Sequence, residues 1–234
     1  LENMVLTGLR GVGKTVLLMD KFKPLAIQNQ WLWIGTDLSE SASVSEESLA
    51  LRLITDLSLV TSNIVFSKEI REILAFKTTT DTIEKKLTYE NLVELYKNIP
   101  GLVSDKLKGI LELIWECIKN TNIKGIIFTY DEAQTICDRP EKEQYPVALL
   151  LDLFQSIQKK NIPFMLVLAG LPTLFPKLVE SRTFAERMFR VVFLEKLHKE
   201  ESMAAIVNPI KSAQCPVSFT DKSTGDPVSY DWKF

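Results

Sequence analysis

A glycine-rich segment near the start of the chain constrains the fold more than any other feature. It reads Gly8-Leu9-Arg10-Gly11-Val12-Gly13-Lys14-Thr15 and fits the pattern G-x-x-x-x-G-K-[S/T] at every fixed position. A short apolar run, Met4–Thr7, precedes the segment, and apolar residues at helical spacing follow it over Lys14–Gln28. A strand, a glycine-rich turn and a helix in this order predict a phosphate-binding loop in a parallel α/β sheet.

The residue types in this loop explain how it would bind a nucleotide. Glycines let the backbone close around an anion because they carry no Cβ, and the backbone N–H groups and the start of the helix then face the phosphates. Lys14 is expected to bridge the β- and γ-phosphates, and Thr15 to place its hydroxyl on Mg²⁺. We therefore expect ATP or another nucleoside triphosphate, with Mg²⁺, as the ligand. The residues expected to line its site are Gly8, Leu9, Arg10, Gly11, Val12, Gly13, Lys14, Thr15 and Val16.

Two adjacent carboxylates end a later apolar strand, predicted over Lys124–Tyr130. Asp131 is expected to hold Mg²⁺ opposite Thr15, and Glu132 to polarise the attacking water as a general base. An apolar strand followed by two acidic residues also occurs where an ordinary strand meets solvent. The roles given to Asp131 and Glu132 therefore depend on the predicted phosphate loop upstream. If those roles hold, the acidic pair favours water over a substrate hydroxyl as the phosphoryl acceptor.

The remaining periodicity predicts a three-layer α/β sandwich with a mainly parallel sheet of about five strands. Further strands are expected over Trp31–Thr36, Pro163–Ala169 and Val191–Leu194, and helices over Leu49–Val60, Ser104–Asn120, Val147–Lys159 and Glu200–Val207. Residues 62–103 are less regular and suggest a helical insertion, with helical stretches at Glu69–Phe76 and Tyr89–Tyr96. We expect one domain over residues 1–212, followed by an irregular tail or the truncated start of a lid over residues 213–234.

Charge and cysteine content narrow the classes of partner. Lys and Arg number 28 against 30 Asp and Glu, so bulk charge does not indicate a nucleic-acid binder, although a local basic patch stays open. The nearest basic cluster, between Lys68 and Lys86, is interleaved with glutamates, which is typical of a solvated face. Three separated cysteines and one histidine favour reduced thiols over disulfides or a zinc site. No apolar run reaches the ~18 residues that span a bilayer, so we expect a cytoplasmic protein without a membrane partner.

Three segments of the chain resemble prokaryotic AAA+-type ATPases related to origin-recognition, transposition-helper and STAND-type signalling ATPases. The segments are Leu6–Leu18, Tyr130–Gln134 and Leu168–Leu174. The positions that match the Walker A and Walker B motifs of this class are Lys14, Thr15, Asp131 and Glu132. The resemblance covers about residues 3–36 and 122–210, and it implies an ATPase whose Mg²⁺-dependent hydrolysis drives a conformational or assembly switch.

The resemblance also implies two finer roles. A polar residue at the end of the fourth strand usually orients water near the γ-phosphate, and Thr173 is the nearest candidate; the alternative is a turn residue that caps the next helix. An arginine finger supplied by a neighbouring subunit would fit the class, with Arg187 preferred over Arg182 and Arg190. The alternative for Arg187 is a surface salt bridge, with Glu186 nearby. A homo-oligomer is therefore an open expectation.

The chain departs from this class at both ends. It begins almost on the first strand, without the upstream segment that contacts adenine, and no helical lid is evident after Asn208-Pro209. We therefore expect a fragment or a chain with an unusual end. Besides the ATPase switch, a slow-turnover nucleotide-sensing module and a nucleic-acid-loading factor stay open, as does a protein partner docking on the amphipathic helix Ser104–Asn120.

Overall fold

The computed structural model describes residues 1–37, 45–62, 64, 86–212, 218–220, 223–225 and 227–229. It divides into two compact units, Leu1–Glu195 and Lys196–Phe234. The second unit contains α10 (Lys199–Ser212), which extends the predicted Glu200–Val207 helix, and an antiparallel pair formed by β6 (Ser218–Thr220) and β7 (Pro227–Ser229). Among the helices that the structure describes, none combines the length and the apolar character that crossing a membrane requires.

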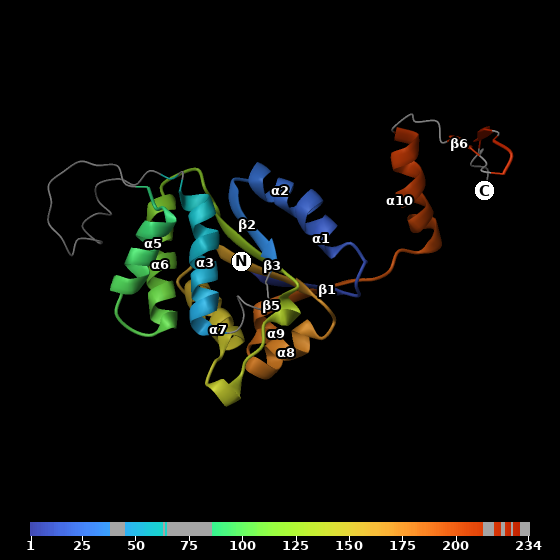
Figure 1. Cartoon of the computed structure of the whole chain (residues 1–234). Helices are drawn as coiled ribbons and strands as arrows, with labels where there is room; N and C mark the ends of the chain where they lie inside the picture. Colours follow the sequence, from blue (N-terminus) through green and yellow to red (C-terminus); the bar gives the residue numbers. More distant parts are fainter. Residues whose placement is uncertain are drawn as a thin grey trace. The chain divides into compact units, whose positions relative to one another are not determined.

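The first unit is built around a five-stranded sheet with the strand order β2-β3-β4-β1-β5 (Figure 1). Its strands are β1 (Asn3–Gly8), β2 (Trp31–Asp37), β3 (Gly125–Asp131), β4 (Phe164–Gly170) and β5 (Phe189–Leu194). Every neighbouring pair in this sheet is parallel, as the sequence predicted. Because all strands point the same way, the loop after β1 and the acidic pair after β3 reach the same edge of the sheet, with only β4 between them.

One face of the sheet is covered by the helix predicted over Lys14–Gln28. The structure divides this helix into α1 (Lys14–Leu17), a π-helical segment η1 (Leu18–Phe22) and α2 (Lys23–Gln28). Pro24 has no N–H to donate four residues back, which favours a change of hydrogen-bond pattern just before it. The buried residues on this face are Leu6, Leu18, Val167 and Ala169.

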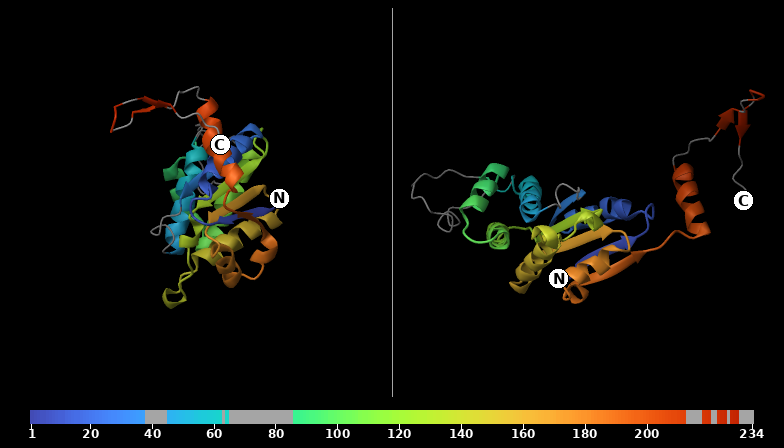
Figure 2. Two further views of the ribbon diagram at one scale, coloured as in Figure 1. Left: turned by 90° about the vertical axis from the view of Figure 1, so that its right-hand side faces the viewer. Right: turned by 60° about the horizontal axis from the view of Figure 1, so that its bottom comes forward.

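The opposite face carries the larger core. The helices that contribute to it are α3 (Glu46–Thr61), α5 (Tyr89–Asn98), α6 (Val103–Ile118), α7 (Pro146–Lys159), α8 (Leu174–Ser181) and α9 (Ala185–Met188). Phe128 of β3 packs edge-on against Phe154 of α7, with ring centroids 5.0 Å apart. Figure 2 shows helices on both sides of the twisted sheet, which is the three-layer sandwich expected from the sequence.

The helix starts show where local prediction was right and where it was not. Ser45 caps α3, accepting a hydrogen bond from the Ser48 backbone N–H at 3.1 Å. The helix predicted over Ser104–Asn120 is α6, which starts one residue earlier: Leu102 occupies its N-cap, and Asp105 accepts the Leu102 N–H at 3.1 Å. The predicted helix at Tyr89–Tyr96 is α5. The stretch Glu69–Phe76, and the basic cluster apart from Lys86, lie outside the described residues.

Candidate functional site

The glycine-rich loop joins the carboxyl end of β1 to α1 in the middle of the sheet. Gly11 and Gly13 have φ angles of 81° and 91°, in the left-handed region where a side chain is strained. A Cβ built on either glycine meets no atom within 4 Å, so the backbone conformation, rather than crowding, requires glycine here. Arg10 in the same loop is exposed.

Lys14, the first residue of α1, turns its side chain back over this loop. Its Nζ donates to the backbone carbonyls of Gly8 and Leu9, each at 2.9 Å, and the residue is 8% exposed. Within the described part of the chain no carboxylate forms a salt bridge with it. A buried ammonium satisfied only by neutral carbonyls keeps its charge available to an anion bound in the loop.

The two predicted motifs meet directly. Thr15 Oγ1 donates a hydrogen bond to Asp131 Oδ2, across 116 residues of sequence. Asp131 is 6% exposed, and its other oxygen accepts the Glu132 backbone N–H at 2.8 Å. A hydroxyl and a carboxylate that converge beside the glycine-rich loop are the hard oxygen donors that Mg²⁺ prefers, so these residues fit the ion.

Glu132 follows Asp131 at the exposed edge of the sheet. Its φ of 51° lies in the left-handed region, which costs a non-glycine residue about 1 kcal/mol, and the turn leads into the short helix η3 (Ala133–Thr135). The Glu132 carboxylate accepts a hydrogen bond from Gln134 Nε2. The chain therefore holds one carboxylate against the loop and directs the next toward solvent.

Comparison with solved structures identifies the fold. Over 90% of its length the chain resembles Cdc6p from Pyrobaculum aerophilum, with a TM-score of 0.51 and 13% sequence identity. The two proteins share an α/β fold of the P-loop type. The chain spans 43% of the length of that Cdc6p. Neither a protein-family model nor a curated protein sequence matches this chain.

Two further structures resemble the chain with lower TM-scores. The Orc1 protein of Aeropyrum pernix, solved with DNA, is 14% identical over 91% of this chain and 44% of its own, with a TM-score of 0.44. The genome-packaging NTPase B204 of Sulfolobus turreted icosahedral virus 2, solved with ATP-gammaS, is 11% identical over 98% of this chain and 96% of its own, with a TM-score of 0.39.

Thr173 lies in the turn between β4 and α8, at the same end of the strands as the glycine-rich loop. The residue is exposed and occupies the N-cap position of α8, but its side chain makes no capping hydrogen bond. The predicted alternative, a turn residue that caps the next helix, is right about the position of Thr173, but the hydroxyl makes no capping hydrogen bond. The role of Thr173 toward a nucleotide stays a prediction.

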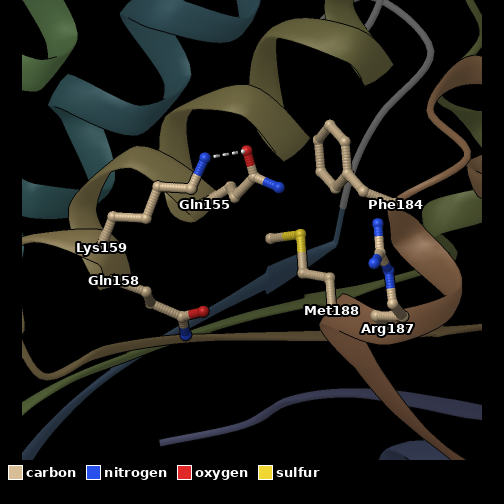
Figure 3. A pocket seen from close by; sticks show the side chains of 6 residues that line it. All are labelled: Gln155, Gln158, Lys159, Phe184, Arg187 and Met188. Atoms are coloured by element: carbon tan, nitrogen blue, oxygen red, sulfur yellow. Dashed lines mark hydrogen bonds between the residues drawn. The ribbon is translucent and has the colours of Figure 1, made fainter.

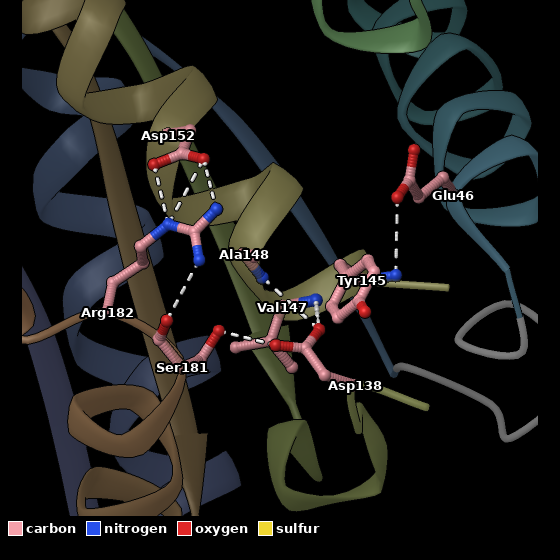
Figure 4. Close-up of polar contacts among 8 residues, drawn as sticks. All are labelled: Glu46, Asp138, Tyr145, Val147, Ala148, Asp152, Ser181 and Arg182. Carbon is pink, nitrogen blue, oxygen red and sulfur yellow. Dashed lines mark hydrogen bonds and ion pairs between the residues drawn. The ribbon is translucent and has the colours of Figure 1, made fainter. Parts of the chain in front are cut away.

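The three candidate arginines have different environments. Arg182 forms a bidentate ion pair with Asp152 of α7, with N–O distances of 2.8 to 3.2 Å (Figure 4). Hydrogen bonding to that carboxylate raises the pKa of Arg182. Arg182 thus serves the contact between α8 and α7, whereas Arg187 and Arg190 are exposed. The pairing of Arg187 with Glu186 is not seen among the described residues.

Arg187 lies far from the loop of its own chain. It belongs to α9, which leads directly into β5, and Phe189 of β5 pairs with Asn3 at the start of β1. Arg187 is therefore at the amino edge of the sheet and the loop at the carboxyl edge. It lines a cavity of about 330 Å³ between α7 and α9 (Figure 3). The lining residues are Gln155, Gln158, Lys159, Phe184, Arg187 and Met188.

One polar residue of the site was missed by the sequence analysis. Gln134 contacts Glu132 through its Nε2 and the Leu171 backbone N–H through its Oε1, the latter at 3.1 Å. Lys177 of α8 also donates to the Gln134 carbonyl at 3.2 Å. An amide two residues beyond the acidic pair was the only available signal, because its partner at the end of β4 lies 37 residues away in sequence.

Proposed function

We propose that this chain binds ATP with Mg²⁺ at Gly8–Val16 and hydrolyses it to drive a conformational or assembly switch. The observation that carries the proposal is the hydrogen bond between Thr15 and Asp131, which brings the glycine-rich loop and the acidic pair to one point. Either motif alone has an ordinary structural explanation. An ordinary structural explanation does not account for the two motifs meeting beside Lys14. Their meeting places a cation, two oxygen donors and an exposed carboxylate around one loop.

Each group of the site would contact a particular part of the bound triphosphate. Backbone N–H groups of the loop and the ammonium of Lys14 would contact the β- and γ-phosphates. Thr15 and Asp131 would hold Mg²⁺, whose chemistry there is to neutralise charge on the phosphate oxygens. The present contact of Lys14 with the Gly8 and Leu9 carbonyls would be exchanged for phosphate oxygens when the nucleotide enters.

The hydrolytic step follows from the position of Glu132. Its carboxylate would accept a proton from a water molecule as that water attacks the γ-phosphorus, and the bond from phosphorus to the β–γ bridging oxygen would break, releasing ADP and phosphate. Lys14 would offset the charge that develops on the phosphate oxygens. Thr173, exposed at the end of the neighbouring strand, would contact the attacking water or the γ-phosphate.

A neighbouring copy would complete the site. Arg187 is exposed, forms no salt bridge among the described residues, and lies at the edge of the sheet opposite to its own loop. An arginine in this position can reach a γ-phosphate only in another molecule. We therefore include a homo-oligomer, with Arg187 acting in trans, in the proposed function.

Steady-state ATP hydrolysis by the wild type, Glu132→Gln and Lys14→Ala, over a range of protein concentrations, tests the proposal. Loss of the general base is expected to lower kcat by about 10²-fold or more, while ATP binding persists. Lys14→Ala is expected to lose binding. Binding is read independently from the stabilisation by ATP and Mg²⁺, which is about 2.7 kcal/mol when ATP is present at 100 times its Kd.

Three outcomes separate the alternatives. Specific activity that rises with protein concentration supports a site completed by a neighbour. Wild-type protein that retains ATP without turnover at any concentration would reject hydrolysis and leave a nucleotide-sensing module. Wild-type protein with no affinity for ATP would reject the proposal entirely.

A further inference from the structure

The side chain of Gln134 connects two segments of the candidate site that are far apart in sequence. Its Nε2 donates to Oε2 of Glu132, and its Oε1 accepts the backbone N–H of Leu171 at 3.1 Å. The first partner follows β3 and the second follows β4, so one amide spans two neighbouring strand ends. Only a group with a donor at one end and an acceptor at the other can make both bonds.

The chemistry of the partners determines which way the amide faces. A backbone N–H can be satisfied only by the carbonyl oxygen of Gln134, and a carboxylate only by its NH₂ group. Turning the amide over would set two donors against each other at Leu171 and two acceptors against each other at Glu132. The orientation is therefore set by its surroundings.

Neighbouring residues also restrain the backbone of Gln134 and the space around its side-chain amide. Lys177 Nζ donates to the Gln134 carbonyl at 3.2 Å, and the preceding residue, Ala133, is 1% exposed. A Cβ on Gly170 would lie 2.5 Å from Gln134 Oε1, so the amide occupies the space that a side chain at this position would need. Contacts from η3, from the end of β4 and from α8 thus hold this one residue.

We propose that Gln134 is a positioning residue for the proposed hydrolysis, which holds the Glu132 carboxylate in one orientation relative to the end of β4. This inference rests on the proposed function of Glu132. A glutamate has three side-chain torsions, and an exposed one is otherwise free to turn. Restraining Oε2 leaves Oε1 available as the proton acceptor, and a base held in place speeds the chemical step without strengthening substrate binding.

Substitution of Gln134 separates orientation from binding. Gln134→Ala removes the amide, and Gln134→Glu keeps its shape but replaces the donor with a second carboxylate next to Glu132. Both variants are expected to lower kcat by about tenfold or more, with the Kd for ATP changed by less than about twofold. Gln28→Ala, an exposed glutamine at the end of α2, is the matched control and should keep the wild-type kcat.

A double substitution tests whether Gln134 acts through Glu132. Glu132→Gln combined with Gln134→Ala should be no slower than Glu132→Gln alone, because no carboxylate is left to orient. Wild-type kcat in both Gln134 variants would overturn this inference but not the proposed function, provided that Glu132→Gln lowers kcat as expected. An additional loss in the double variant equal to that of Gln134→Ala would also overturn it. Wild-type turnover in Glu132→Gln would overturn the proposed function and this inference together.

Discussion

Gly170 determines how closely the end of β4 and Gln134 approach each other. A methyl group at this position would lie 2.5 Å from Gln134 Oε1 and 3.0 Å from Leu174 Cδ2. Both atoms are at the ends of flexible side chains, so the fold can absorb the methyl group but the amide must move. Gly170→Ala is therefore expected to lower kcat by about tenfold with little change in Tm, as measured by steady-state kinetics and thermal unfolding.

Gly109 provides the control for this prediction. It lies within α6, where the atoms nearest to an added Cβ belong to the flexible side chain of Ile99, the first at 3.2 Å. Gly109→Ala should keep the wild-type kcat and can gain up to about 1 kcal/mol from helix propensity. Wild-type kcat in Gly170→Ala would show that the position of the Gln134 amide does not matter for turnover.

The thiol of Cys117 should be unreactive at neutral pH. Burial, followed by the nearby Glu116 carboxylate, raises its pKa from 9.0 to about 12. Because the folded pKa is the higher one, the neutral thiol stabilises the fold fully below pH 9.0, and that contribution is lost as the pH rises toward about 12. Alkylation by iodoacetamide, followed by mass spectrometry of the Cys117 peptide, should accelerate throughout this range. A rate that levels off near pH 9 would contradict the shift.

At the scale of single elements, the start of α7 depends on a carboxylate from outside the helix. Asp138 accepts the backbone N–H groups of Val147 and Ala148 at 2.8 and 3.3 Å, and Ser181 Oγ donates to it at 2.5 Å (Figure 4). The carboxylate satisfies N–H groups that have no partner within the helix and opposes the positive end of the helix dipole. One side chain thereby connects the segment after β3 to α7 and α8.

Asp138→Ala is expected to lower the free energy of unfolding by about 1–2 kcal/mol, because it removes this cap. The urea midpoint should fall while the m-value stays constant. Asp20→Ala, an exposed aspartate in η1, is the control and should change stability by less than about 0.5 kcal/mol. A midpoint for Asp138→Ala equal to that of the control would refute the capping role.

At the scale of the whole molecule, the separation of Arg187 from its own loop can be tested by mixing. If the proposed function holds, Arg187→Ala and Glu132→Gln should each be inactive alone. A mixture should recover activity, because one variant supplies Glu132 and the other supplies Arg187 at a shared interface. Steady-state ATP hydrolysis of the mixture, compared with each variant at the same total concentration, measures this recovery.

Arg182→Ala serves as the comparison for the mixing experiment. Arg182 is paired with Asp152 of its own chain, so its loss should lower stability and should not be corrected by a partner molecule. Wild-type turnover in Arg187→Ala, or a mixture no more active than its components, would exclude a finger at this position.

Much of the fold was predictable because its signals are local. The apolar runs that became β1, β3 and β4 are short and uninterrupted, and the glycines of the loop mark the turn into α1. The acidic pair Asp131-Glu132 was predicted at a strand end and lies there. The start of α6 was predicted one residue too late because two polar residues, Ser104 and Asp105, lie within one turn, and only the geometry of the turn shows that Asp105 makes the capping contact.

The sequence by itself determined the parallel α/β fold, the glycine-rich turn after the first strand and the acidic pair, since strand periodicity and glycine positions act over a few neighbouring residues. Only the tertiary structure decided that Thr15 meets Asp131, that Gln134 joins Glu132 to the end of β4, and that Arg182 is engaged while Arg187 is exposed. These contacts join distant residues. They depend on the order of strands in the sheet and on the packing of helices over both its faces, which no local propensity specifies.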